Sequence, residues 1–135
     1  AVEAAVAAGE RAGIPFVLNA RTDAYLRGRD RDPEELLADV IERGRAYLGA
    51  GAACLFVPGR LDERTVARLV EALGERKISI MGVPGSISLS TAQELGVARV
   101  SYGPFTQSVA LAALHDLAED VYAGGGLPPD LRLFT

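Results

Sequence analysis

The stretch from Phe16 to Tyr25 places polar side chains where a buried strand is expected to end. It begins as an apolar run after Gly13-Ile14-Pro15, which is typical of a buried parallel strand, predicted here over 16–20. Side chains alternate along a strand, so Asn19 and Arg21 share one face with Asp23 and Val17 if the chain stays extended. The opposite layer is then expected to receive Phe16, Leu18 and Ala20.

A guanidinium at the tip of such a strand is suited to one chemical task. Arg21 could hold a carboxylate or a phosphate through two parallel hydrogen bonds. An equally good interpretation is an Arg21–Asp23 pair that only fastens a loop. The pattern alone does not choose between these two hypotheses.

Composition and charge narrow the class of protein. The chain has 135 residues, of which 49% are hydrophobic and 24% charged, with a net charge of −4, enough for one domain with a core. Mild acidity disfavours a nucleic-acid partner, and no apolar run has membrane-spanning length. One cysteine excludes an internal disulfide framework, and the absence of a secretory signal pattern favours a cytoplasmic setting. The start at Ala1 suggests a processed, trimmed or partial chain.

Strand and helix patterns alternate along the whole chain. Helix starts are indicated by Asp32-Pro33 and by Asp62, which are favourable N-cap sequences, and Gly13 is a favourable C-cap. Strands are predicted near 16–20, 54–58, 78–82 and 98–102, and a C-terminal helix is predicted near 105–123. Between them we expect helices over 1–13, from 33 to about 48, from 62 to about 74, and from about 88 to 96.

This order predicts an α/β fold with parallel strands and right-handed crossovers. Four units cannot close a barrel, which takes eight strands and about 250 residues. A doubly wound sheet is the other solution, but the turn after the first strand is not rich in glycine. We therefore predict a single partial domain over 1–135, half of a TIM-type barrel with four β/α units. A missing half or a partner chain would complete it.

Three stretches, in this order and spacing, resemble the isocitrate lyase/phosphoenolpyruvate mutase superfamily, in particular its 2-methylisocitrate lyase-like members. They are Asn19-Ala-Arg21-Thr22-Asp23-Ala24, the run from Arg45 to Pro58-Gly59, and the run from Leu95 to Gly103-Pro104. The resemblance implies a TIM-type barrel that cleaves or forms C–C or P–C bonds in small α-keto or α-hydroxy carboxylates. The shared chemistry uses Mg²⁺ to stabilise an enolate-like species.

The resemblance also assigns roles to residues. Arg21 falls on the substrate-anion-binding arginine, and Asn19, Asp23, Ser79 and Ser101 would line the inner tip region. The metal ligands and the catalytic lid belong to the other barrel half, so no catalytic residue and no metal ligand are expected in this chain.

Two positions bear on the branch of the superfamily. Gly59 stands where lyase members have Glu, and Ser79 stands where the family has Asn; both departures disfavour a true isocitrate or methylisocitrate lyase. Cys54 is expected to be a small core residue.

Other polar segments have simpler interpretations. The loops at Gly82–Ser86 and Ser101–Pro104 occupy positions that often cradle phosphate in TIM barrels, but turn glycines and helix caps explain them more readily. The charged loop at 26–32 is expected to be solvated, although it lies beside the presumed mouth.

Two functional hypotheses remain at this point. The first is part of a Mg²⁺-dependent lyase or mutase-like enzyme for a small carboxylate or phosphonate, inactive as this chain alone. The second is a non-catalytic half-barrel that serves as an assembly partner, because unpaired strand edges invite pairing. Both predict association with the missing barrel half, with another copy, or with both.

Overall fold

The computed structural model describes residues 1–28 and 30–132. Residue 29, in the predicted charged loop, and residues 133–135, in the predicted tail, lie outside the described residues. The chain divides into two compact units, Ala1–Tyr102 and Gly103–Thr135, and each is described by itself.

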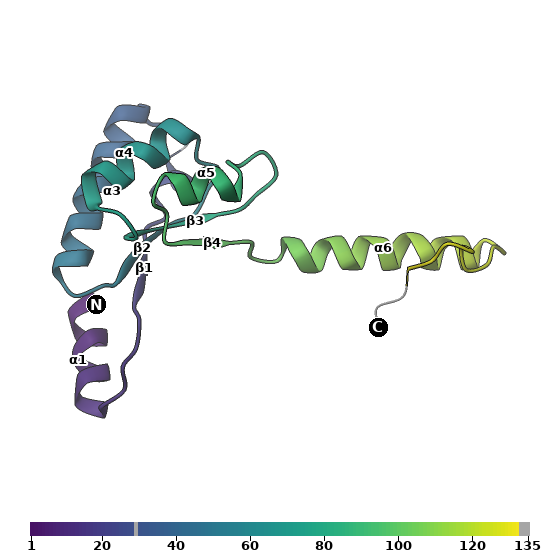
Figure 1. Ribbon diagram of the computed structural model, residues 1–135, viewed down its shortest axis with the longest axis horizontal. Helices are drawn as coiled ribbons and strands as arrows, with labels where there is room; N and C mark the ends of the chain where they lie inside the picture. Colours follow the sequence, from purple (N-terminus) through teal and green to yellow (C-terminus); the bar gives the residue numbers. More distant parts are fainter. Residues whose placement is uncertain (29, 133–135) are drawn as a thin grey trace. The chain divides into compact units, whose positions relative to one another are not determined.

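Helices and strands alternate as the sequence predicts, except for the short helix over Ala24–Arg27, which was not predicted and whose end overlaps the predicted charged loop at 26–32 (Figure 1). In chain order the elements are α1 (Val2–Ala12), β1 (Asn19–Arg21), α2 (Ala24–Arg27), α3 (Pro33–Gly49), β2 (Cys54–Val57), α4 (Glu63–Leu73), β3 (Ile78–Met81), α5 (Leu89–Glu94), β4 (Arg99–Ser101) and α6 (Phe105–Tyr122).

The four strands form one parallel sheet in the order β1-β2-β3-β4. The pairing sets Arg21 beside Phe56, Phe56 beside Ser79, and Ser79 beside Arg99. Sequential strands that pair in parallel through helical crossovers form the start of a barrel wall rather than a doubly wound sheet. The sheet is not closed, since β1 and β4 are its two edges.

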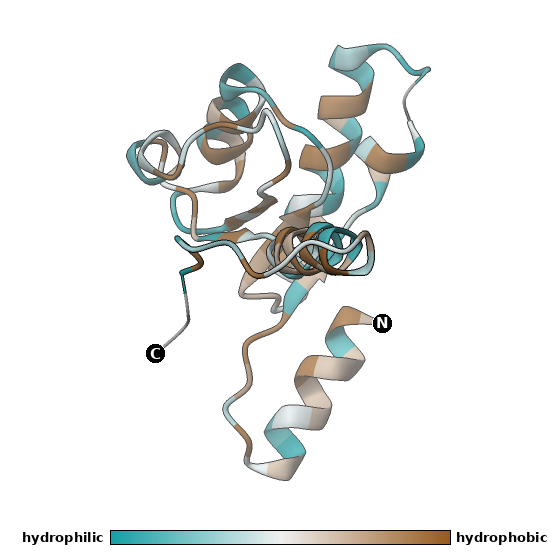
Figure 2. Cartoon of the chain, turned by 90° about the vertical axis from the view of Figure 1, so that its right-hand side faces the viewer, coloured by the Kyte–Doolittle hydropathy of each residue, from teal (hydrophilic) through white to brown (hydrophobic). Residues whose placement is uncertain are grey.

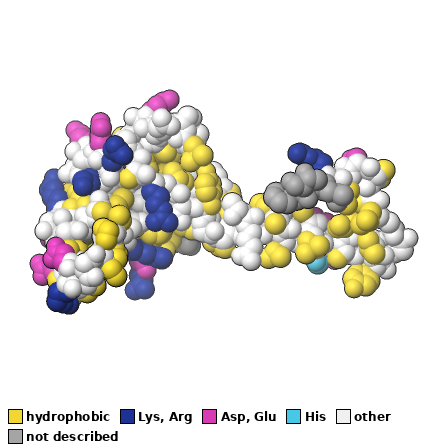
Figure 3. Space-filling model, turned by 60° about the horizontal axis from the view of Figure 1, so that its bottom comes forward, with side chains coloured by type: hydrophobic (Ala, Val, Ile, Leu, Met, Phe, Trp, Pro, Cys, Tyr) yellow, Lys and Arg dark blue, Asp and Glu magenta, His cyan; other side chains and the backbone are white. Residues whose placement is uncertain are grey.

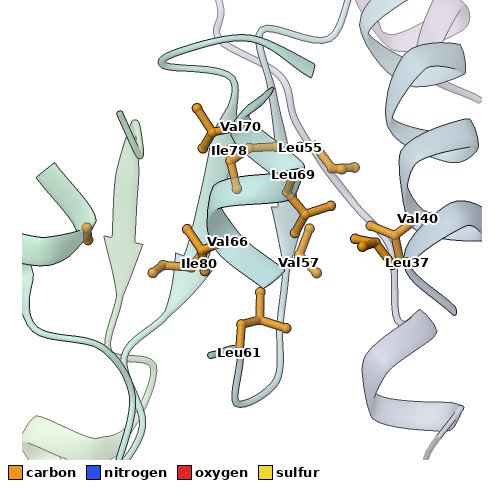
Figure 4. Packing of buried hydrophobic residues seen from close by; sticks show 11 residues of the cluster. Leu37, Val40, Leu55, Val57, Leu61, Val66, Leu69, Val70, Ile78 and Ile80 are labelled. Atoms are coloured by element: carbon orange, nitrogen blue, oxygen red, sulfur yellow. The ribbon is translucent and has the colours of Figure 1, made fainter. Parts of the chain in front are cut away.

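The hydrophobic core lies between one face of this sheet and the helices α3 and α4 (Figure 4). Leu55 and Ile78 on the sheet and Leu69 on α4 are fully buried there. The helices approach closely at Gly44, where a Cβ atom would lie 2.6 Å from a methyl carbon of Leu73. The core therefore takes the side chains on one face of the sheet, and the side chains on the opposite face lie outside it.

The helix ends follow the predicted capping signals. The Asp32 carboxylate accepts hydrogen bonds from the backbone N–H groups of Glu34 and Glu35, at 2.9 and 3.1 Å. Asp62 accepts from Thr65 N–H at 2.8 Å. These bonds satisfy N–H groups that a helix leaves without intrahelical partners.

The first strand lies later than the predicted 16–20. Residues 14–18 have no regular structure, and Val17 is 78% exposed rather than part of a strand face. Phe16, predicted in the buried layer, is 48% exposed. The reason is the partner strand: β2 begins only at Cys54, which pairs with Asn19, so earlier residues have no strand beside them.

The second unit contains α6, which matches the predicted C-terminal helix within one residue. Seen nearly end-on in Figure 2, α6 carries hydrophobic and hydrophilic residues. Several of its apolar side chains are exposed, namely Val109, Leu111, Leu114, Val121 and Tyr122. In the described part of the chain, every helix is too short or too polar to cross a membrane.

The buried position of Leu69 predicts a stability difference. Leu69→Ala removes a fully buried side chain and should lower the free energy of unfolding by about 2–5 kcal/mol. Leu89→Ala, at a leucine that is 58% exposed, should change it by less than about 0.5 kcal/mol. Urea unfolding followed by circular dichroism measures both, and equal losses would contradict this description of the core.

Candidate functional site

The site residues lie on the sheet face opposite the core. Because side chains alternate along a strand, the residues between the core positions point the other way. We call this the inner face; it is formed by Asn19, Arg21, Cys54, Phe56, Ser79, Met81, Arg99 and Ser101. Four of the five residues predicted for the site therefore occupy one face, and Asp23 follows directly after β1.

Arg21 is held in a defined position at the carboxyl end of β1. Its Nε atom donates a hydrogen bond to Asp23 Oδ1 at 2.5 Å, and its guanidinium carbon lies 5.8 Å from the centre of the Phe56 ring. The side chain is still 52% exposed. Within the described residues, its two terminal nitrogens have no hydrogen-bond partner, so the end of the guanidinium can receive an anion.

Asp23 stands between two arginines. One is Arg21, which donates to Asp23 Oδ1. The other is Arg27, whose guanidinium lies 3.9 Å from Asp23 Oδ2, too far for a hydrogen bond. The predicted Arg21–Asp23 pair exists, but it uses only one edge of the guanidinium. Loop fastening and anion binding are thus compatible rather than alternative.

Asn19 and Ser79 meet across the inner face. The Asn19 side-chain amide donates to Ser79 Oγ at 3.4 Å, over the intervening strand β2. Ser79 is fully buried, and Asn19 Oδ1 is a buried acceptor without a partner in the described part of the chain. An unpaired buried polar atom costs about 1–3 kcal/mol, so a donor from water or a ligand would stabilise this place.

Ser101 and Cys54 also lie on the inner face, but neither bonds to the other site residues within the described part of the chain. Ser101 lies level with Met81, and its hydroxyl makes no hydrogen bond to the other site residues among those described. Cys54 is buried as expected, although it lies on the inner face and outside the main core cluster, and this burial raises the pKa of its thiol and keeps the thiol neutral.

A second charged group flanks Arg21 and was not predicted. Arg31 and Arg43 both donate to Asp39, at 2.8 and 2.7 Å. Their hydrogen bonds lower the pKa of Asp39 below its ordinary value. The spacing of Asp39 and Arg43 on α3 could have indicated their pair, but nothing local in the sequence brings Arg31 to them.

Figure 3 shows Lys and Arg side chains gathered in several places on the surface of the larger unit. Four arginines also take part in the lining of a hollow of about 550 Å³, formed by Arg21, Thr22, Asp23, Ala24, Arg27, Gly28, Arg31, Asp39 and Arg43. We call it the basic hollow. It begins at the predicted anion-binding arginine and continues along α2 and α3.

The loop after β3 is closed by its own residues. Ser86 Oγ accepts from Val83 N–H at 3.0 Å and donates to the Met81 carbonyl at 3.3 Å, and Gly85 has φ +80°. The hydroxyl is therefore occupied by the turn, which favours the simpler interpretation of this loop.

Gly59, two residues after the end of β2, has a conformation that suits glycine. Its φ is +129°, and a Cβ atom placed there would lie 3.2 Å from Tyr25 Cβ. The position where the resembling lyases carry Glu is thus shaped here for a residue without a side chain.

The described residues offer no ready-made metal centre. Among residues 1–28 and 30–132, no three His, Cys, Asp or Glu side chains gather closely enough to hold a metal ion. Asp23, the acid at the tip of β1, is bound to Arg21. The residues present do not fit a Mg²⁺ site by themselves.

Comparisons with solved structures agree with this geometry. A candidate phosphonomutase from Burkholderia cenocepacia J2315 is 36% identical, with a TM-score of 0.78, over 87% of this chain and 47% of its own. The enzyme 2,3-dimethylmalate lyase, a PEP mutase/isocitrate lyase superfamily member, is 26% identical, with a TM-score of 0.77, over 97% of this chain and 46% of its own. Oxaloacetate acetylhydrolase is 28% identical, with a TM-score of 0.78, over 97% of this chain and 44% of its own.

The sequence comparisons point the same way. Rv1998c, an uncharacterized protein of Mycobacterium tuberculosis H37Rv, is 34% identical over 111 residues, which are 82% of this chain and 41% of that protein. A family model described as phosphoenolpyruvate phosphomutase matches residues 1–122.

The open parallel sheet is therefore half of a TIM-type barrel, as predicted. The chain belongs to the phosphoenolpyruvate phosphomutase family, within the PEP mutase/isocitrate lyase superfamily. It spans less than half the length of the relatives compared above.

Asp39 predicts an acid-dependent contribution to stability. Its pKa is lowered in the folded chain, so its ion pairs stabilise the fold above the unfolded-state value, about 3.9, and this contribution is lost as the pH falls through the folded value. Asp39→Asn should therefore be less stable than the wild type near pH 6, and the difference should shrink toward about pH 2. Urea unfolding at several pH values measures this. Asp116→Asn, on α6, is the control, and a pH-independent difference for Asp39→Asn would contradict the assignment.

Proposed function

We propose that this chain supplies the substrate-anion-binding part of a lyase or mutase-like enzyme for small α-keto or α-hydroxy carboxylates. The observation that carries the proposal is the Arg21 guanidinium, which Asp23 and Phe56 position and whose side chain is half exposed, with its terminal nitrogens unbonded among the described residues. Membership of the family supports it, since the solved relatives include a lyase and a hydrolase of small carboxylic acids by name.

Arg21 would bind a carboxylate or phosphonate end-on. Asp23 occupies Nε, which leaves the two terminal nitrogens to donate two parallel hydrogen bonds to one anionic group. The Phe56 ring beneath the guanidinium restricts its orientation, so less conformational freedom is lost when the substrate binds.

The neighbouring polar groups would orient the rest of the substrate. Asn19 offers a buried acceptor that a hydroxyl of an α-hydroxy acid can satisfy, and Ser79 lies next to it. Asp23 acts through Arg21, so it is a positioning residue. Ser101, level with Met81, lines the same face farther from Arg21 along the sheet.

The bond-breaking chemistry would come from outside this chain. In the described residues the acids near Arg21 are ion-paired and Cys54 is a neutral buried thiol, so no base or nucleophile is prepared here. Mg²⁺, which would stabilise an enolate-like species, would be held by the other barrel half. The glycine at 59 favours the mutase-like and hydrolase-like branch over a true isocitrate lyase.

The decisive variant is Arg21→Ala in a protein that carries this chain with the other half of the barrel. We expect KM to rise at least about tenfold, or turnover to be lost, because each hydrogen bond to a charged group contributes about 1.5–3 kcal/mol. Steady-state kinetics over a panel of small keto acids, hydroxy acids and phosphonates measures it.

Two further variants sharpen this test. Arg21→Lys keeps the charge but not the paired hydrogen bonds, and should recover only part of the affinity. Arg64→Ala, at an arginine 80% exposed and 3.9 Å from Glu34, is the control and should leave kinetics unchanged. Wild-type kinetics in a folded Arg21→Ala protein would end the assignment.

An assembly role is the second candidate, and the sheet itself favours it. β1 and β4 have free edges, and the inner face carries half-buried residues such as Phe56 and Met81 that a closed barrel would cover. Parallel strands with open edges pair readily with other strands. We therefore propose that this sheet associates with another barrel half, either the missing half or a second copy; α6 is a candidate contact for dimerisation.

Light scattering of the 135-residue chain tests this association. We expect a concentration-dependent mass above that of the monomer, and a melting temperature that rises with protein concentration. A strictly monomeric chain that melts sharply and independently of concentration would contradict the assembly proposal.

A further inference from the structure

The basic hollow holds more positive than negative charge. Four arginines and two aspartates line its volume of about 550 Å³, which leaves an excess of two positive charges. Asp23 is shared by Arg21 and Arg27, and Asp39 is shared by Arg31 and Arg43. No carboxylate of the hollow is left over to neutralise the second arginine of either pair.

The hollow also has more hydrogen-bond donors than acceptors. Arg21 and Arg43 each use Nε, and Arg31 uses one terminal nitrogen. The Arg27 guanidinium makes no hydrogen bond among the described residues, and the side chain is 84% exposed. Guanidinium groups can only donate, so the ligand that fits this lining must be rich in acceptors and negatively charged.

Fastening the loop accounts for only part of this arrangement. The Arg31–Asp39 bond ties the loop after α2 to α3, and Arg43 orients Asp39 from the same helix. Arg27 serves neither purpose, because its contact with Asp23 at 3.9 Å adds little at such exposure. Arg27 therefore lines the hollow with a charge that no hydrogen bond to a described residue holds in place.

We propose that the basic hollow is a second oxyanion-binding site, in which Arg27, Arg31 and Arg43 hold a phosphate or carboxylate group separately from the anion assigned to Arg21. Its volume lies within the range of about 300–1,000 Å³ that small-molecule sites occupy. The group is either a free oxyanion or the second anionic end of a ligand that also reaches Arg21. The site stands whether or not Arg21 serves a reaction.

Titration calorimetry of the chain with inorganic phosphate and with malonate tests this site. Ionic strength is held constant with NaCl, because exposed arginines respond to screening. Arg27→Gln and Arg31→Gln should each weaken anion affinity at least threefold, about 0.65 kcal/mol, the first without disturbing a hydrogen bond.

Arg64→Gln is the matched control. The two arginines have similar surroundings: Arg64 is 80% exposed and lies 3.9 Å from Glu34, and Arg27 is 84% exposed and lies 3.9 Å from Asp23. Arg64, however, does not line the hollow. Its loss should leave anion affinity unchanged. If it weakens binding as much as Arg27→Gln, the effect is general charge and the site is refuted.

Arg21→Gln separates the two anion sites. Saturable phosphate binding that survives Arg21→Gln but not Arg27→Gln supports a site for a free oxyanion. If malonate binds but phosphate does not, and if both Arg21→Gln and Arg27→Gln weaken malonate binding, the hollow receives the second anionic end of a ligand that also reaches Arg21. Loss with Arg21→Gln only, or no saturable binding of either probe, overturns the inference, and the first of these outcomes leaves the proposed role of Arg21 intact.

Discussion

The parallel pairing of β1 with β2 is the constraint on which the rest of this structure depends. Asn19 lies beside Cys54, the first residue of β2, which follows the turn at 50–51. That register sends Ala20 into the core and Arg21 to the inner face, level with Phe56. A shift of one residue would exchange the two faces and bury a guanidinium among leucines, so the core and the candidate site are fixed by the same hydrogen bonds.

The sheet consequently has two chemically different sides. Its helix-covered side is filled with Leu, Ile and Val and supplies the stability, whereas the inner face carries two arginines, two serines and an amide. Polar groups at the carboxyl ends of parallel strands are where TIM-type barrels place their ligand sites. The paired acids and the buried thiol in this half suit binding and orientation rather than bond cleavage.

Much of this arrangement could be predicted from local signals. Capping residues such as Asp32 and Asp62 marked the helices correctly, and strands β2 to β4 lie within one residue of the predicted ranges. The start of β1 was wrong, because a hydrophobic run does not reveal where its partner strand begins. The Arg31–Asp39 bond was not predicted either, since it depends on how a loop folds back onto α3.

The placement of the candidate site residues could be predicted only in part. Strand alternation predicted that Asn19 and Arg21 share one face, and the family resemblance added Ser79; the structure places all three on the inner face. The interaction of Arg21 with Phe56 could have been predicted only with the strand register, which adjacent residues do not encode.

Gly59 has a consequence for how the chemistry of this family can change. A side chain at this position would need a different backbone, because φ is +129°, and a different place for Tyr25. An acid could not be gained there by a single codon change without strain in the turn after β2 and in α2. The preference for glycine is therefore set by the path of the main chain, and mutation that exchanges side chains one at a time meets a barrier at this position.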